Sequence, residues 1–157
     1  MICIRICEAR DIEHVAELLN ELSDVASTDN DFNVENLVNI FEEMESKPEI
    51  YSNLVAEMDG IIAGFISVVF YKTLYHKGGT ALINELIINS NFRGLGIGSL
   101  LVKRVKEEAI KRGMDELEVG TEITNEAAQL FYKKCGFNEE YILLGMEFEA
   151  WILGQDQ

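Results

Sequence analysis

A stretch with three alternating glycines joins an apolar run to a long amphipathic run, and it limits the fold of the chain more than any other feature. The run Ala81–Ile88 is rich in β-branched residues and short enough for a buried strand. After the glycine stretch Asn91–Leu100, the apolar residues Leu101, Val105 and Ala109 recur at helical spacing with charged residues between them. The sequence therefore predicts a strand, a glycine-rich loop and a helix.

Such a loop is suited to binding an anion. Glycine permits backbone conformations that other residues avoid, and it lets a ligand approach the main chain closely. The first N–H groups of the helix, from about Gly98, lack partners within the helix and lie at the positive end of its dipole. Both features favour phosphate, although a β-to-α turn without a ligand would carry similar glycines.

The spacing of the glycines separates this loop from two better-known phosphate loops. It is not a P-loop, because no Gly-Lys-Ser/Thr follows, and it does not fit the dinucleotide fingerprint G-x-G-x-x-G. Arg93, Gly96 and Gly98 instead form the pattern R-x-x-G-x-G. In this form the loop resembles the pyrophosphate-binding loop of the GNAT superfamily of acetyl-CoA-dependent acetyltransferases.

A second motif lies at the expected place after the loop. The stretch Asn125–Phe137 has the pattern N-x-x-A-x-x-F-Y-x-x-x-G-F, which resembles the helix that lines the pantetheine arm in GNAT enzymes. The two motifs together cover residues from about 82 to 137. The resemblance implies an α/β fold with a mixed, mostly antiparallel central sheet flanked by helices, and acetyl-CoA as co-substrate.

The resemblance also implies which residues bind the cofactor. Backbone groups of Leu86, Ile87 and Ile88 would hold the pantetheine, and Asn125 and Ala128 would contact the same arm. The loop would surround the pyrophosphate with Arg93, Gly94, Leu95, Gly96, Ile97, Gly98 and Ser99.

Two side chains are candidates for proton transfer. Tyr132 matches a tyrosine that often protonates the departing CoA thiolate and lines the cofactor site; a core aromatic beside Phe131 is the alternative. Glu85 lies on the strand that enters the loop and could accept the proton of an ammonium group; a surface or salt-bridged carboxylate is the alternative.

The pair Asn84-Glu85 departs from a more specific resemblance. The surrounding residues are similar to those of diamine and polyamine acetyltransferases, which usually have two adjacent acidic residues here. Because an asparagine cannot accept the proton, either Glu85 serves as the base, or Asn84 holds a water that does, or the substrate differs.

The balance of charge bears on the partners. The chain has 28 acidic and 13 basic residues, a formal net charge of −15, which argues against nonspecific binding to nucleic acid. A cationic substrate would be attracted, although an acidic surface also serves solubility alone.

The organisation of the chain fits one domain over residues 1–157. The longest apolar run, Ile61–Tyr71, is too short for a membrane helix, and the N-terminus lacks the pattern of a signal peptide, so we expect a cytoplasmic protein that does not bind membranes. The three cysteines, Cys3, Cys7 and Cys135, form no metal-like cluster, and we expect buried or partly buried thiols and no metal.

The remaining pattern gives the order of the elements. We expect strands over residues 2–7, 52–58, 61–71, 80–88, 116–121 and 141–148, of which the middle ones form an antiparallel meander with a turn at Asp59-Gly60. Helices are expected over residues 11–22, with Asp11 as N-cap, over 34–44, from the glycine loop to Gly113, and over 125–134. Residues 23–33 are expected to form a loop.

These observations support one leading hypothesis and two alternatives. The first is an N-acetyltransferase that transfers an acetyl group directly from acetyl-CoA to a primary amine in a ternary complex, with a cationic small molecule among the candidate acceptors. The second keeps the cofactor but takes a protein or peptide amine as acceptor. The third is a noncatalytic acyl-CoA-binding module. The sequence leaves the oligomeric state open, with a homodimer as one option.

Overall fold

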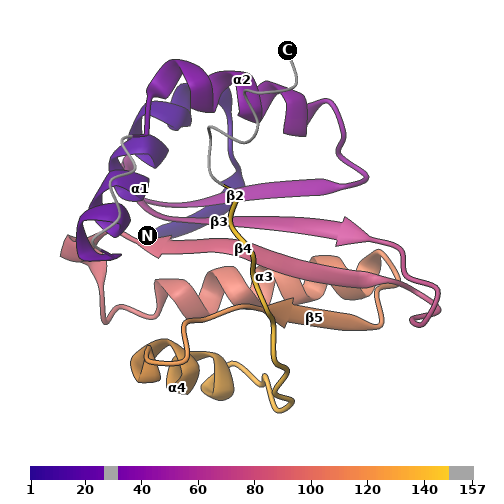
Figure 1. The fold of residues 1–157 in the computed structure, drawn as a ribbon. Coiled ribbons are helices and arrows are strands. Elements are labelled where there is room, and N and C mark those ends of the chain that lie inside the picture. Colours follow the sequence, from indigo (N-terminus) through magenta and orange to yellow (C-terminus); the bar gives the residue numbers. More distant parts are fainter. Residues whose placement is uncertain (27–31, 149–157) are drawn as a thin grey trace.

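The central element of the structure is a five-stranded sheet between two layers of helices (Figure 1). The structure is a computed structural model that describes residues 1–26 and 32–148. The strand order follows the chain: β1 (Ile2–Ile6), β2 (Tyr51–Met58), β3 (Ile61–Tyr71), β4 (Thr80–Ile88) and β5 (Glu116–Val119). Strands β1 to β4 pair antiparallel, and β5 pairs parallel to β4. The predicted mixed, mostly antiparallel sheet is confirmed.

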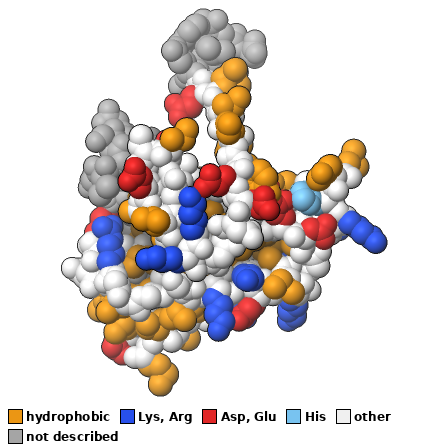
Figure 2. All heavy atoms as spheres, turned by 90° about the horizontal axis from the view of Figure 1, so that it is seen from below, with side chains coloured by type: hydrophobic (Ala, Val, Ile, Leu, Met, Phe, Trp, Pro, Cys, Tyr) orange, Lys and Arg blue, Asp and Glu red, His pale blue; other side chains and the backbone are white. Residues whose placement is uncertain are grey.

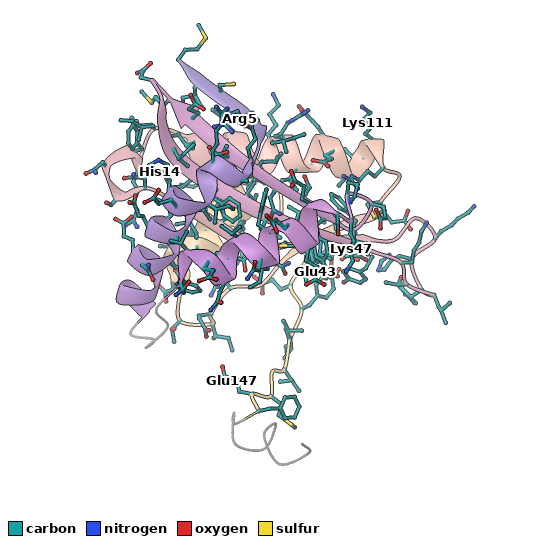
Figure 3. All side chains as sticks on the ribbon, turned by 90° about the horizontal axis from the view of Figure 1, so that it is seen from above. Arg5, His14, Glu43, Lys47, Lys111 and Glu147 are labelled. Carbon is teal, nitrogen blue, oxygen red and sulfur yellow. The ribbon has the colours of Figure 1, made fainter. Side chains whose placement is uncertain are left out.

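Helices cover both faces of this sheet. On one face lie α1 (Ile12–Ala26) and α2 (Val34–Glu45), which Figure 3 views from outside, and on the other lie α3 (Ile97–Lys111) and α4 (Glu126–Lys134). Short 3₁₀ turns, η1 (Ala9–Asp11) and η2 (Ser90–Phe92), precede α1 and α3. Just after α2, Lys47 Nζ lies 3.1 Å from Glu43 Oε1, one helical turn back (Figure 3).

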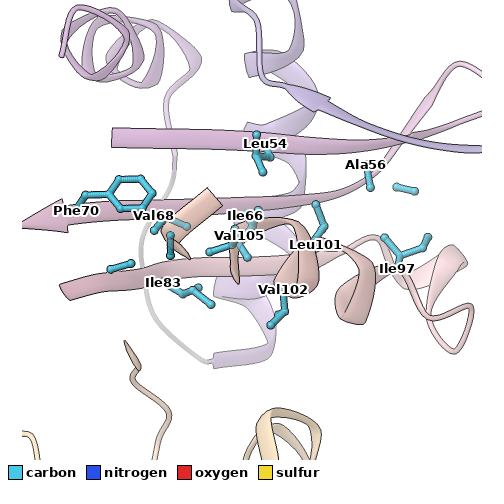
Figure 4. Close-up of a cluster of buried hydrophobic side chains, with 13 residues drawn as sticks. Leu54, Ala56, Ile66, Val68, Phe70, Ile83, Ile97, Leu101, Val102 and Val105 are labelled. Carbon is cyan, nitrogen blue, oxygen red and sulfur yellow. The ribbon is translucent and has the colours of Figure 1, made fainter. Parts of the chain in front are cut away.

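The core divides into two clusters because successive strand residues point to opposite faces. Ile66 and Val68 of β3 pack with Leu101 and Val105 of α3, and Figure 4 shows these side chains between helix and sheet. Phe65 of β3 belongs to the second cluster, beneath α1 and α2. The long apolar run of β3 therefore reflects burial on both faces.

The start of the first helix differs from the prediction, in which Asp11 was the N-cap. Glu8 is the N-cap of the 3₁₀ turn, and Asp11 is its third residue, with its Oδ2 accepting the N–H of Glu8 at 2.8 Å. Both carboxylate oxygens of Asp11 also accept hydrogen bonds from Arg5, at 2.7 and 2.9 Å. Asp11 can be buried here because Arg5 of β1 supplies its counter-charge.

Three other predictions need correction. Helix α1 continues to Ala26, so the loop predicted over 23–33 begins later, and residues 27–31 lie outside the described part. Cys3 is exposed, whereas we expected all three thiols to be at least partly buried. The strand predicted over 141–148 is wrong: these residues have no regular structure and are exposed. Apolar content alone does not make a strand, because a strand also needs a neighbour to pair with its backbone.

Candidate functional site

Strand β4 is paired on both sides for only half of its length. Its pairing with β5 ends at Ile83 and Val119, while its pairing with β3 continues to Ile88. Opposite β3 the register shifts, because Ser67 faces Glu85 while Val68 faces Ile83, which leaves Asn84 as a bulged extra residue. Among the described residues, no strand pairs with the free edge at 84–88, so its backbone groups can accept a ligand.

The free edge leads directly into the glycine loop. Gly94 and Gly96 have φ angles of 77° and 78°, in the left-handed region, and Gly96 is the N-cap of α3 without a side-chain cap hydrogen bond. Residues 93–96 are exposed, as is Ser99. The first N–H groups of α3 are therefore available to an anion from outside, as the sequence suggested.

Two other residues of the predicted loop are buried, for reasons that do not involve a ligand. The side chain of Ile97 is 1% exposed and belongs to the core, so only its backbone can take part in binding. A Cβ atom at Gly98 would lie 3.1 Å from Cζ of Phe131, so this glycine lets α4 approach α3 closely. The glycine loop and the helix of the second motif are thereby in direct contact.

Tyr132 lies on α4 and packs among other aromatic rings. It is partly buried, with edge-to-face contacts to Phe131 and Phe137 at centroid distances of 5.0 and 5.5 Å. Burial raises the pKa of Tyr132 to about 12, so its phenol keeps its proton at neutral pH. Asn125 caps this helix, with its Oδ1 accepting the N–H of Ala128 at 3.0 Å.

Glu85 lies on the other face of the sheet from Tyr132. Its neighbour on the same face of β4, Ile87, belongs to the cluster beneath α1 and α2, whereas Tyr132 packs against the cluster beneath α3. Burial raises the pKa of the Glu85 carboxyl above its ordinary value, and the hydroxyl of Ser67 opposes this effect. Asn84 is exposed at the bulge. The two candidate proton-transfer residues thus lie on opposite faces of the sheet.

Charge is distributed unevenly around this edge. Figure 2 shows basic side chains spread over the face that carries α3 and α4, with hydrophobic and acidic side chains between them. Eight of the 13 basic residues lie on the loop, α3, its C-cap and α4: Arg93, Lys103, Arg104, Lys106, Lys111, Arg112, Lys133 and Lys134.

The opposite face carries acidic residues that sequence reasoning did not single out. Glu116 and Glu118 of β5 stand opposite Thr80 and Leu82 of β4, on the same face as Glu85. Their alternation with apolar residues in β5 was visible in the sequence. Their side of the sheet depends on the parallel register and on the bulge, which no local pattern reveals.

Two grooves of the described surface lie away from these residues. One groove, of about 370 Å³, runs between α1 and residues 89–91, and another, of about 540 Å³, lies between α2 and α3 at the start of β2. Neither is lined by Glu85, Tyr132 or residues 93–99. Within the described residues, no group of His, Cys, Asp and Glu could hold a metal ion, and no helix is long and apolar enough to span a membrane.

Comparison with known proteins agrees with the two motifs. The family model of the acetyltransferase (GNAT) family matches residues 12–137. The chain belongs to this family. A crystal structure of glucosamine-6-phosphate N-acetyltransferase from Arabidopsis thaliana, 25% identical, superimposes with a TM-score of 0.81 over 95% of this chain and 99% of that chain. The GNAT family generally uses acetyl-CoA, and the glycine loop and the free edge of β4 both lie within the matched region.

Two relatives with known sequences match more locally. An uncharacterised N-acetyltransferase of Methanocaldococcus jannaschii is 34% identical over 92 residues, which are 58% of this chain and 41% of that protein. N-alpha-acetyltransferase 30 of Schizosaccharomyces pombe is 37% identical over 96 residues, which are 57% of this chain and 64% of that protein. The GNAT chain therefore matches less than two thirds of either relative, and the names of the Arabidopsis and Schizosaccharomyces proteins point to different acceptors.

Proposed function

We propose that this chain is an N-acetyltransferase that moves an acetyl group from acetyl-CoA to a primary amine, directly and within a ternary complex. The observation that carries the proposal is the free edge of β4, which includes Glu85 and leads into the exposed N-terminus of α3. Membership of the GNAT family supports the same reaction.

The cofactor would lie along this edge. Backbone groups of residues 86–88 are free to pair with the amide groups of the pantetheine, and the N–H groups of residues 94–99 suit the pyrophosphate. Arg93 and the basic side chains of α3 favour the anionic nucleotide end. Acetyl-CoA supplies the acetyl thioester and, after transfer, a thiolate that needs a proton.

The two candidate side chains would handle the protons. Glu85, or a water beside Asn84, takes a proton from the acceptor ammonium, because only the free amine can attack the thioester carbonyl. Tyr132 gives its proton to the departing thiolate, and its raised pKa means that it is protonated at neutral pH.

The acidic residues favour a cationic small molecule as acceptor. Glu85, Glu116 and Glu118 share one face near the reacting centre, and the net charge of −15 attracts cations from a distance. A protein or peptide amine is the second candidate acceptor, because the chain is similar over 96 residues to N-alpha-acetyltransferase 30 of Schizosaccharomyces pombe.

Binding and turnover test the proposal in sequence. Calorimetry should detect acetyl-CoA binding, and a thiol assay should detect CoA release with at least one member of a panel of diamines, polyamines, amino sugars and peptides with free N-termini. Absence of both signals refutes the proposal. Binding with no turnover on any amine would instead support a noncatalytic acyl-CoA-binding module.

Two substitutions test the assigned roles. Tyr132→Phe should lower kcat by about 100-fold or more, which is the usual contribution of a general acid. The affinity for acetyl-CoA should stay within about twofold of the unmodified protein. Glu85→Gln should lower kcat/KM similarly. In the unmodified protein, activity should fall at acidic pH as Glu85 becomes protonated, and this fall should be absent in Glu85→Gln. Tyr75→Phe, at an exposed tyrosine far along the β3–β4 connection, is the control and should leave turnover unchanged. Unchanged turnover in Tyr132→Phe removes the proposed acid.

A further inference from the structure

A row of three polar residues crosses the middle of the sheet beneath α1 and α2. Asn53 of β2 pairs with Ser67 of β3, and Ser67 pairs with Glu85 of β4. All three side chains lie on the face of the second apolar cluster, because Val55, Phe65 and Ile87 two residues away belong to it. Such a row interrupts an otherwise apolar face, so it needs an explanation.

Two atoms of this row are buried without a hydrogen-bond partner. Ser67 is 2% exposed and Asn53 is 9% exposed, and neither Ser67 Oγ nor Asn53 Oδ1 has a partner among the described residues. The amide nitrogen of Asn53 makes only a weak contact, 3.9 Å from Sδ of Met44. Leaving a buried polar atom unpaired destabilises the folded protein, and a bound water is a common way in which such atoms are satisfied.

We propose that Ser67 and Asn53 are positioning residues, which hold a buried water beside Glu85 and keep its carboxylate ionised. The water would donate to the Glu85 carboxylate and to Asn53 Oδ1 and accept from the hydroxyl of Ser67, which gives it three polar partners. The inference rests on the proposed function only for the role of Glu85 as base.

The placement of the row explains why Glu85 needs this help. A carboxylate beneath two helices loses solvation, which favours its protonated form, and hydrogen bonds to the charged form have the opposite effect. Ser67 pairs directly with Glu85 across β3 and β4, so a water on its hydroxyl would lie beside the carboxylate. Asn53 lines the groove between α2 and α3, so the far end of the row lies beside solvent from which a water can enter.

Other ionisable groups on this side do not take part in the row. Those on α1 and α2 are exposed or half-buried, and those on β5 lie further along the same face: Glu13, His14, Glu17, Glu21, Glu35, Glu42, Glu43, Glu45, Glu116 and Glu118. They are unchanged in the variants below. A difference between these variants in the pKa of Glu85 therefore reports the loss of the hydroxyl, the amide or the water.

Carbon-13 NMR of the side-chain carboxyl of Glu85 tests the inference in the free protein, with Glu85→Gln used for assignment. In Ser67→Ala we expect the pKa of Glu85 to rise by about one pH unit, and in Asn53→Leu to rise in the same direction. Ser67→Thr keeps the hydroxyl and should restore the value of the unmodified protein. In the active enzyme, the acidic limb of kcat/KM should move to higher pH by the same amount in Ser67→Ala.

Val69→Ala is the matched control, because Val69 lies on the same face of β3 and carries no polar atom. A rise in Ser67→Ala but not in Val69→Ala supports the proposal. A pKa in Ser67→Ala within about 0.3 pH unit of the unmodified protein, or an equal rise in Val69→Ala, overturns it. The titration needs neither acetyl-CoA nor an acceptor, so its outcome does not depend on whether the proposed reaction occurs.

Discussion

Replacing Arg5 by Met should destabilise the protein by leaving Asp11 buried without its counter-charge. The guanidinium of Arg5 donates to both carboxylate oxygens of Asp11, and its Nε lies 2.8 Å from Oε2 of Glu57. The side chain of Asp11 is 5% exposed, whereas that of Arg5 is 22% exposed. Methionine fills a similar volume but cannot donate, so Asp11 would keep only the N–H of Glu8.

The expected loss can be bounded from these contacts. Removing one partner of a buried ion pair typically costs about 3–5 kcal/mol. We expect about 3 kcal/mol, at the low end of that range, because Asp11 retains one backbone donor and lies next to a partly exposed arginine. For a chain of this length that loss lowers the melting temperature by about 6–12 °C.

The pH dependence of this stability loss distinguishes an ion pair from a packing contact, because only the ion pair depends on the charge of Asp11. Arg5 holds the pKa of Asp11 below its ordinary value, against the effect of burial. A carboxyl with a depressed folded pKa contributes stability above its unfolded pKa and loses it as the pH falls through the folded value. The difference between the unmodified protein and Arg5→Met should therefore be complete at about pH 7 and shrink below about pH 4.

Urea unfolding followed by circular dichroism at several pH values measures this difference. The double variant Arg5→Met/Asp11→Leu should recover a substantial part of the loss, because it removes the unpaired charge. A loss below about 1 kcal/mol at neutral pH, or an equal loss at acidic pH, would refute the reasoning and show that the pair behaves as an exposed one.

Three further predictions concern the loop, the thiols and the core. Gly96→Ala forces an alanine to a φ near 78° and should cost about 1 kcal/mol in urea unfolding, with weaker acetyl-CoA binding in calorimetry. Iodoacetamide followed by mass spectrometry at about pH 8 should label the exposed Cys3 but spare Cys7, because burial raises the pKa of Cys7 to about 12; equal labelling would contradict its burial. Leu101→Ala, at a fully buried position, should cost about 2–5 kcal/mol in urea unfolding; a loss below about 1 kcal/mol would show that the site collapses.

Local sequence determined the elements that depend on a residue and its near neighbours. The glycine loop before α3 and the turn at Asp59-Gly60 follow from local backbone conformation, which short patterns encode. The family resemblance likewise came from two motifs, each within a dozen or so residues. These are the features for which the predictions agree with the structure.

Tertiary structure decided which distant residues share a face. The bulge at Asn84 brings Glu85 opposite Ser67, and the register of β2 extends this row to Asn53. Strand pairing also explains why the strand predicted over residues 141–148 does not form: these residues are mostly apolar but have no paired neighbour among the described strands. Register depends on pairing between strands far apart in sequence and shifts with a single inserted residue, so the chain alone could name Glu85 but not the residues that surround it.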